Sequence, residues 1–206
     1  MIRHALILTF RNIKRYKRSF IINVVGLSIG LATVLLIYIW TYHELSIDKF
    51  HEKNDRLYQV MRNVTDEKDD IVTFDNNSDL LAPALKEELP EVEHIVPVSE
   101  AISNGLLSND KTSIKAIGQF AGKDFFKIFS FQLTHGDENH VLDDKYAIVI
   151  SNEVAKKLFG TVEYAIGKSV VLNEERFGDT YIISGSFKKN MESSESFDFL
   201  GTNEMF

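Results

Sequence analysis

One short loop of the sequence gathers side chains that could bind a metal ion. It contains four carboxylates and two imidazoles: His135, Asp137, Glu138, His140, Asp143 and Asp144. A calcium loop requires oxygen ligands at alternate positions that close on a glutamate, and a helical zinc motif requires two histidines one helical turn apart. The loop has neither spacing. We therefore expect a solvated loop rather than a metal site.

The stretch from Gly160 to Ser169 resembles a phosphate-binding loop. Such a loop has four residues between its two glycines, so that backbone amides wrap a phosphate, and it joins a strand to a helix. Here six residues separate Gly160 from Gly167. The pattern also predicts a helix before the stretch and a strand after it. Nucleotide binding is therefore not expected here.

The serines and histidines that could act in nucleophilic catalysis do not form a recognisable motif. Four serines lack the Gly-x-Ser-x-Gly context of a nucleophile elbow: Ser46, Ser108, Ser151 and Ser184. His43 and His51 lie eight residues apart, and we expect both to be exposed. The sequence has no cysteine, which removes thiolate chemistry and disulfides. We expect that the chain is not an enzyme, and we assign no catalytic, cofactor-binding or metal residue.

The elements that position these residues are organised around an apolar run from Phe20 to Trp40. The run contains no charged residue over about twenty positions, the length of helix that crosses a hydrocarbon layer of roughly 30 Å. We predict a transmembrane helix over residues 20–42, which stays uncleaved because the run is longer than that of a signal peptide. Gly26 and Gly30 form a small-residue step that favours packing of a neighbouring helix.

The residues before this run are basic, and those after it are net acidic. Residues 1–19 are predicted to form a cytoplasmic amphipathic helix, with a disordered basic tail as the alternative. The excess of positive charge places this end in the cytoplasm and residues 43–206 across the membrane. Five basic residues are expected at lipid headgroups of the inner face: Arg11, Lys14, Arg15, Lys17 and Arg18. A nucleic-acid partner is not expected, because the residues after position 20 carry 17 basic and 30 acidic side chains.

Residues 43–206 are predicted to form one extracytoplasmic domain of mixed α+β class. Helices are expected over residues 80–89 and 151–159, and the phenylalanines of residues 123–131 are expected in the core. Alternation predicts a strand over residues 57–64 with one half-buried face, and Asn104-Gly105 suggests a turn. Further strands are expected over residues 93–98, 112–120, 147–150, 168–172 and 180–187. The order of the elements shows no regular βαβ repeat, which favours α+β over a doubly wound sheet.

Several stretches of the chain resemble the N-terminal part of MacB/FtsX-like ABC transporter permeases, in the version common among Bacteroidetes-type bacteria. The stretch after the apolar run is similar to the family pattern YDxFHxNxDRIYRV. The similar stretches cover nearly the whole chain in the family's order: LTFRNIKRYKRSFIINVVGLSIGLA, ELSIDKFHEKNDRLYQV, LAPALKEELPEVE, KDFFKIFSFQLTHGD, VLDDKYAIVISNEVAKKLFG and AIGKSV. Near the end the chain departs from the family, because KKNMESSESFDFL replaces a proline-containing loop and a His-Phe pair.

The resemblance implies a permease subunit of the bacterial inner membrane with a periplasmic core domain. ATP would be bound by a partner cytoplasmic ABC ATPase, whose cycle moves the periplasmic domain in efflux, export or a lipoprotein or cell-envelope process. The resemblance also implies a second permease copy or homologue, a periplasmic partner protein and contact with membrane lipid. Because such permeases are longer, we expect a fragment with an incomplete domain over residues 43–206. A single-span sensor or ligand-binding module is the alternative function.

Overall fold

The computed structural model describes residues 11, 14–78, 80–173, 178–190, 193–194 and 196–202. Contacts divide the chain into two compact units, Met1–Ile47 and Asp48–Phe206. The predicted amphipathic helix over residues 1–19 lies largely outside the described residues. Five of its basic residues are described, and all are exposed: Arg11, Lys14, Arg15, Lys17 and Arg18.

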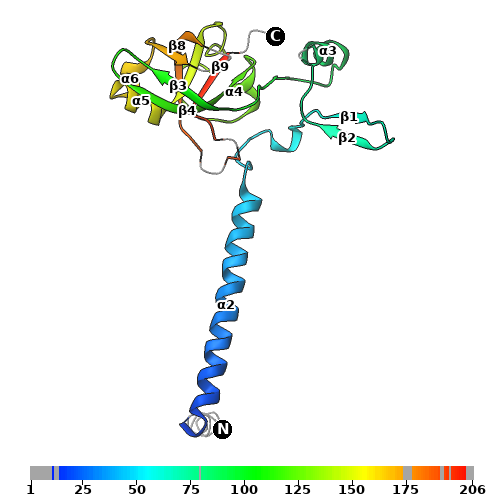
Figure 1. Ribbon diagram of the computed structural model, residues 1–206, viewed down its shortest axis with the longest axis vertical. Coiled ribbons are helices and arrows are strands. Elements are labelled where there is room, and N and C mark those ends of the chain that lie inside the picture. The colour runs from blue at the N-terminus through cyan, green and yellow to red at the C-terminus, as the bar shows by residue number, and fades with distance from the viewer. Residues whose placement is uncertain are drawn as a thin grey trace. The chain divides into compact units, whose positions relative to one another are not determined.

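The first unit is dominated by one long helix, α2 (Lys17–Ser46), which contains the predicted span (Figure 1). It is the one described helix that is long and apolar enough to cross a membrane, with a mean hydropathy of 2.5. Its 30 residues correspond to about 45 Å, more than a hydrocarbon layer of roughly 30 Å. None of its side chains is buried. Its apolar surface is therefore uncovered on all sides.

The second unit is built on a seven-stranded mixed sheet with the order β5-β8-β6-β9-β4-β3-β7. The pairs β4–β9 and β6–β8 are parallel, and the other pairs are antiparallel. Strand β7 pairs with both β3 and β8, so six of the strands form a closed cycle of pairings. The strands are β3 (Ile102–Ser108), β4 (Ser113–Ala121), β5 (Leu133–His135), β6 (Ala147–Ser151), β7 (Ser169–Asn173), β8 (Asp179–Phe187) and β9 (Phe199–Thr202).

The core lies on both faces of this sheet, because successive side chains of a strand point to opposite faces. In β6, Ile148 and Ile150 belong to one hydrophobic cluster and Val149 belongs to the other. The first cluster is completed by two helices and the second by one: α5 (Asn152–Phe159), α6 (Val162–Ala165) and α4 (Phe125–Ile128). The mixed α+β class predicted from the sequence is confirmed.

Helix α5 was predicted correctly from the residues at its two ends, Ser151 and Gly160. The hydroxyl of Ser151 accepts a hydrogen bond from the backbone N–H of Val154 at 3.3 Å, so Ser151 is the N-cap of α5. Gly160 ends the helix with a φ of 86°, a backbone conformation that side chains disfavour. The phenylalanines of α4 are also core residues as predicted, since Phe125 and Phe126 are buried.

The segment between the long helix and β3 differs most from the sequence expectations. It contains a 3₁₀ turn, a two-stranded hairpin and a helix: η1 (Asn54–Arg56), β1 (Arg62–Thr65), β2 (Ile71–Phe74) and α3 (Leu81–Glu88). The strand predicted over residues 57–64 begins only at Arg62, and all four of its residues are exposed. Residues 93–98 form no strand beyond a single bridge at Val98. Gly105 is part of β3 rather than a turn, because it faces Ala116 of β4 across a bulge.

Candidate functional site

The acidic loop at residues 135–144 holds ordinary surface contacts. His140 Nδ1 lies 2.8 Å from a carboxylate oxygen of Asp143, and both side chains are exposed. Asp137 accepts hydrogen bonds from the backbone and side-chain nitrogens of Asn139. Within the part of the chain that the structure describes, no group of three or more potential ligands could hold a metal ion.

The glycine stretch and the serines have structural partners. Gly160 ends a helix and Ser169 begins β7, the reverse of the order that a phosphate-binding loop requires. The hydroxyl of Ser184 donates to the carbonyl oxygen of Val141 at 2.6 Å. The other three serines also bond to the backbone: Ser46 to His43, Ser108 to Val171 and Ser151 to Val154. None of these hydroxyls is placed beside a general base.

His51 is the residue for which the expectation was wrong, since it is buried, with only 6% of its surface exposed. Its Nδ1 accepts a hydrogen bond from the backbone N–H of Ser130 at 3.1 Å. The ring lies against Phe50, with centroids 3.9 Å apart, and edge-on to Phe129 and Phe131. This histidine is therefore part of the aromatic core rather than a solvated side chain.

The residues that flank His51 in the chain also form hydrogen bonds with distant segments of the domain. Asp48 accepts hydrogen bonds from the backbone N–H of Ser194, at 2.9 Å, and from its hydroxyl. The N–H of Glu52 donates to the hydroxyl of Ser130 at 3.0 Å. The ammonium of Lys53 donates to the carbonyl oxygen of Lys127, also at 3.0 Å. We call residues 48–53, with their partners Lys127, Ser130 and Ser194, the clamp.

Backbone conformation adds a second feature at the start of the clamp. Asp48 has a φ of 60°, in the left-handed region that non-glycine residues rarely adopt. Such a conformation costs free energy and persists only where surrounding contacts hold it. The two hydrogen bonds from Ser194, which lies 146 residues further along the chain, supply those contacts.

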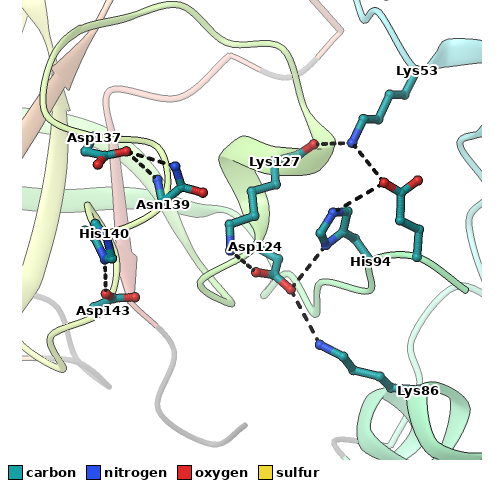
Figure 2. A network of polar contacts seen from close by, with 10 residues as sticks. Lys53, Lys86, His94, Asp124, Lys127, Asp137, Asn139, His140 and Asp143 are labelled. Atoms are coloured by element: carbon teal, nitrogen blue, oxygen red, sulfur yellow. Dashed lines mark hydrogen bonds and ion pairs between the residues drawn. The ribbon is translucent and has the colours of Figure 1, made fainter.

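A polar network lies next to the clamp and is centred on the buried carboxylate of Asp124 (Figure 2). The ammonium of Lys127 lies 2.9 Å from Asp124, His94 Nδ1 lies 3.6 Å away, and the ammonium of Lys86 lies 3.8 Å away. Glu93 extends the network, with Lys53 at 4.0 Å and His94 at 3.8 Å. The network therefore connects α3 with α4, and it shares Lys53 and Lys127 with the clamp.

The charges in this network determine how Asp124 titrates. Burial by itself would raise the pKa of Asp124, but the hydrogen bond and charge of Lys127, with the charges of Lys86 and His94, lower it below its ordinary value. The same hydrogen bond raises the pKa of Lys127. In His51, burial lowers the pKa and the charge of Asp48 opposes that shift. The carboxylate is thus charged and the imidazole neutral at neutral pH.

This arrangement holds segments of the domain together. Its carboxylate, ammonium and imidazole groups are paired with one another or with the backbone, and no nucleophile faces a base among the residues described here. The predicted span residues belong to the first unit. Phe20 and Trp40 are exposed, and no atom would meet a Cβ added at Gly26 or Gly30 within 4 Å.

Comparison with known proteins agrees with this reading of the domain. The MacB-like periplasmic core domain matches residues 20–206. The chain belongs to this family. Among curated proteins, none matches the chain. ABC transporter permeases that carry such a domain are not themselves enzymes.

The similar solved structures include one that shares the fold of the domain. A domain from Porphyromonas gingivalis, assigned to a permease protein, has a TM-score of 0.56 and 24% identity over 69% of this chain and 60% of that chain. The chain therefore spans about three fifths of that structure. The periplasmic region of MacB from Actinobacillus actinomycetemcomitans has a TM-score of 0.46 and 18% identity, over 61% and 55% of the two chains. The extracellular domain of the noncanonical ABC-type transporter YknZ from Gram-positive bacteria has a TM-score of 0.42 and 20% identity, over 58% of each.

Family membership and the long apolar helix together describe a membrane-anchored protein with an extracytoplasmic domain. The sequence predicted the membrane anchor and the extracytoplasmic domain, but it did not predict the clamp. The available signal was the stretch similar to the family pattern YDxFHxNxDRIYRV, because its aspartate, phenylalanine and histidine are Asp48, Phe50 and His51 of the clamp. Ser130 and Ser194 carried no signal, since their role depends on contacts across the whole domain.

Proposed function

We propose that this chain is the first membrane span and periplasmic core domain of an ABC transporter permease, and that the clamp passes motion of the span to the domain. In this proposal ATP is hydrolysed by a partner cytoplasmic ABC ATPase. The N-terminus lies in the cytoplasm, the span crosses the inner membrane, and a second permease copy completes the membrane part. The process served is efflux, export or a lipoprotein or cell-envelope process.

The observation that carries the proposal is the position of the clamp in the chain. Helix α2 ends at Ser46, and Asp48 already bonds to Ser194 of the domain. Only Ile47 stands between them, and no glycine- or serine-rich linker is present. A flexible linker would absorb displacement of the helix end, because such a segment behaves as a random coil. A junction of one residue leaves too little chain to absorb a displacement of the helix end.

The contacts of the clamp support a mechanical role because they are varied and reach distant segments. The hydrogen bonds of the clamp involve α4, the loop after α4 and a loop before β9, which are remote in sequence from residues 48–53. The ring of His51 is also buried among the aromatic rings of Phe50, Phe129 and Phe131. Displacing the clamp would therefore require breaking several interactions together, and coupling in proteins travels through such contiguous contacts.

The experiment uses the full permease assembled with its ATPase in lipid nanodiscs. Hydrogen exchange is measured over residues 125–132 and 188–198, without nucleotide and with the ATPase trapped in its ATP-bound state. The proposal predicts an ATP-dependent change in exchange over these segments. The double variant Asp48→Ala with His51→Ala should lose that change while the complex still assembles and hydrolyses ATP.

His140→Gln is the matched control, because it removes an imidazole contact at a distance from the clamp in sequence and outside its contacts. It should keep the ATP-dependent change in exchange. If the double variant responds to ATP as the wild type does, the clamp is not the route by which motion reaches the domain.

A further inference from the structure

Residues 54–94 begin directly after the clamp and end beside it. One carboxylate oxygen of Glu93 lies 4.0 Å from Nζ of Lys53, and the other lies 3.7 Å from Nη1 of Arg56. Between these two ends the chain forms η1, the β1–β2 hairpin and α3. We call residues 54–94 the arm. Its two ends therefore lie side by side, and the elements between them form an excursion from the domain.

The arm adds little to the hydrophobic core of the domain. All of its residues except residue 79 are described, and none of the described ones is buried. Neither of the two hydrophobic clusters of the described residues includes a residue of the arm. Strands β1 and β2 pair with each other and not with a described strand of the seven-stranded sheet. Apolar packing and strand pairing therefore contribute little to the position of α3 on the domain.

The carboxylate of Asp124 contacts both the arm and α4 (Figure 2). Its Oδ1 lies 2.9 Å from the ammonium of Lys127 on α4. Its Oδ2 lies 3.8 Å from the ammonium of Lys86 on α3 and 3.6 Å from Nδ1 of His94, the last residue of the arm. One oxygen of this carboxylate thus contacts α4, and the other contacts the arm.

The contacts of these two oxygens differ in strength. The hydrogen bond from Lys127 to Oδ1 is short, and both of its groups are charged, which strengthens it. By contrast, the side chain of Lys86 is 55% exposed and lies almost 4 Å from Oδ2. Ion pairs at exposed positions are weak and are screened by salt. The contact at Oδ2 can therefore break while the contact at Oδ1 remains.

We propose that Oδ2 of Asp124 is a latch that holds α3 on α4, and that the arm opens when this contact breaks while the core of the domain stays folded. The latch is electrostatic, because it joins a buried carboxylate to an exposed ammonium and an imidazole. Low ionic strength should favour the closed arm, and high ionic strength should favour the open one. This device goes beyond the coupling role of the clamp and requires no ATP.

The test measures the distance between the arm and the core in the 206-residue chain in lipid nanodiscs. Spin labels are placed at Ala84→Cys on α3 and Lys157→Cys on α5, both exposed positions. Ala84 lies two residues from Lys86 and so projects from another side of the helix. Pulsed electron resonance should give one narrow distance distribution at about 0.01 M salt. The distribution should broaden at about 1 M salt, where the screening length is about 3 Å.

Asp124→Asn changes the contact of the arm and preserves that of α4. Since Lys127 requires an acceptor, the amide oxygen takes the position of Oδ1, and the amide NH2 group then faces Lys86. The variant should show the broad distribution already at low salt, with little further response to salt. Asp143→Asn, the same change at an exposed carboxylate outside the arm, should retain the narrow distribution and its response to salt.

Lys86→Gln tests the latch from the arm, at an exposed side chain whose loss leaves the core intact. It should also broaden the distribution at low salt, whereas Lys115→Gln, at an exposed position of β4, should not. Urea unfolding followed by circular dichroism should remain cooperative in the Lys86 variant, which shows that the core is folded. If Asp124→Asn fails to fold, Lys86→Gln decides the question alone.

Three results would overturn the proposal. A narrow distribution in Lys86→Gln at low salt, equal to that of the wild type, would show that other contacts hold the arm. A broad distribution in the wild type at low salt would show that the arm is not latched. Equal broadening in Asp143→Asn or Lys115→Gln would assign the effect to net charge rather than to Asp124. Because no ATP is used, none of these results bears on the coupling role of the clamp.

Discussion

At the scale of single residues, His51 is held as a neutral imidazole by its surroundings. Because Nδ1 accepts a hydrogen bond from the N–H of Ser130, its proton must lie on Nε2. A second proton would place two N–H groups face to face inside an aromatic site. Burial lowers the pKa of His51 from 6.5, and Asp48, the charged group that opposes this shift, does not outweigh burial. Protonation should therefore loosen the clamp.

The pH dependence of stability follows from that shift. Since the folded-state pKa of His51 lies below 6.5, the unfolded chain binds more protons at mildly acidic pH. The contribution of His51 to the free energy of unfolding should be complete above about pH 6.5 and should fall as the pH drops through the folded-state pKa. His140 acts in the opposite direction, because its hydrogen bond to Asp143 raises its pKa.

The variant His51→Asn distinguishes the pH-dependent contribution of His51 to stability from that of His140. An asparagine retains an acceptor near the position of Nδ1 and does not titrate. Urea unfolding of the 206-residue chain in lipid nanodiscs, followed by circular dichroism between pH 8 and pH 5, should show a smaller loss of stability on acidification in the variant than in the wild type. Equal losses would mean that His51 titrates normally in the folded state.

For the polar network, the prediction concerns the contribution of Asp124 to the free energy of unfolding. Its carboxylate is buried and charged, and three cationic or imidazole groups face it: Lys86, His94 and Lys127. Asp124→Ala should lower the free energy of unfolding by about 1.5–3 kcal/mol, the range for a lost hydrogen bond to a charged group. Asp143→Ala, which removes the exposed carboxylate beside His140, should leave the unfolding midpoint unchanged. Similar effects of the two variants would show that Asp124 is effectively solvated.

At the scale of elements, α4 and its aromatic neighbours tie the clamp to the core. Phe126 is buried and packs edge-on against Phe125, with ring centroids 5.4 Å apart. Phe126→Ala should cost about 3–5 kcal/mol of unfolding free energy, because it leaves a cavity in a packed core. Tyr164→Ala on α6, which removes an exposed ring, should cost much less. A near-neutral result for Phe126→Ala would contradict its place in the core.

Helix α2 makes a prediction that concerns assembly rather than folding. Because a Cβ at Gly30 would meet no atom within 4 Å, Gly30→Leu should leave the extracytoplasmic domain of this chain unchanged. In the full permease the bulky side chain should weaken packing against a neighbouring membrane helix, measured as a loss of intact complex after mild detergent extraction. Leu31→Phe, which places a bulky apolar side chain at the next position, is the control. Unchanged assembly of the Gly30 variant would make the glycine step incidental.

The elements predicted correctly from the sequence are those whose signals are local. The strand at β6 is a short apolar run, and the helix that follows it has its cap at Ser151 and its stop at Gly160. The sequence-based predictions were wrong where tertiary contacts determine the local structure. Gly105 lies in a strand because its backbone pairs with β4, and a Cβ added at Gly105 would lie 3.2 Å from the Phe199 ring, which leaves little space for a side chain. His51 appeared solvated because nothing local indicates the aromatic site around it.

At the scale of the whole molecule, the clamp begins the second unit at Asp48, directly after Ile47, the last residue of the first unit. The family and the sheet fold account for the extracytoplasmic domain, and the apolar helix accounts for the membrane anchor. The proposed coupling between them depends on the clamp remaining closed when the helix moves. The cysteine-free sequence makes this directly measurable, because two labels can be introduced without background.

The most direct measurement is the distance distribution between spin labels at Leu45→Cys, in the last turn of α2, and Glu163→Cys, on α6 of the domain. The 206-residue chain is studied in lipid nanodiscs by pulsed electron resonance. The proposed function predicts one narrow distribution in the wild type and in His140→Gln. With Asp48→Ala and His51→Ala together, the distribution should become broad. A broad distribution in the wild type, or an unchanged width in the double variant, would contradict the proposal that the clamp couples the membrane helix to the domain.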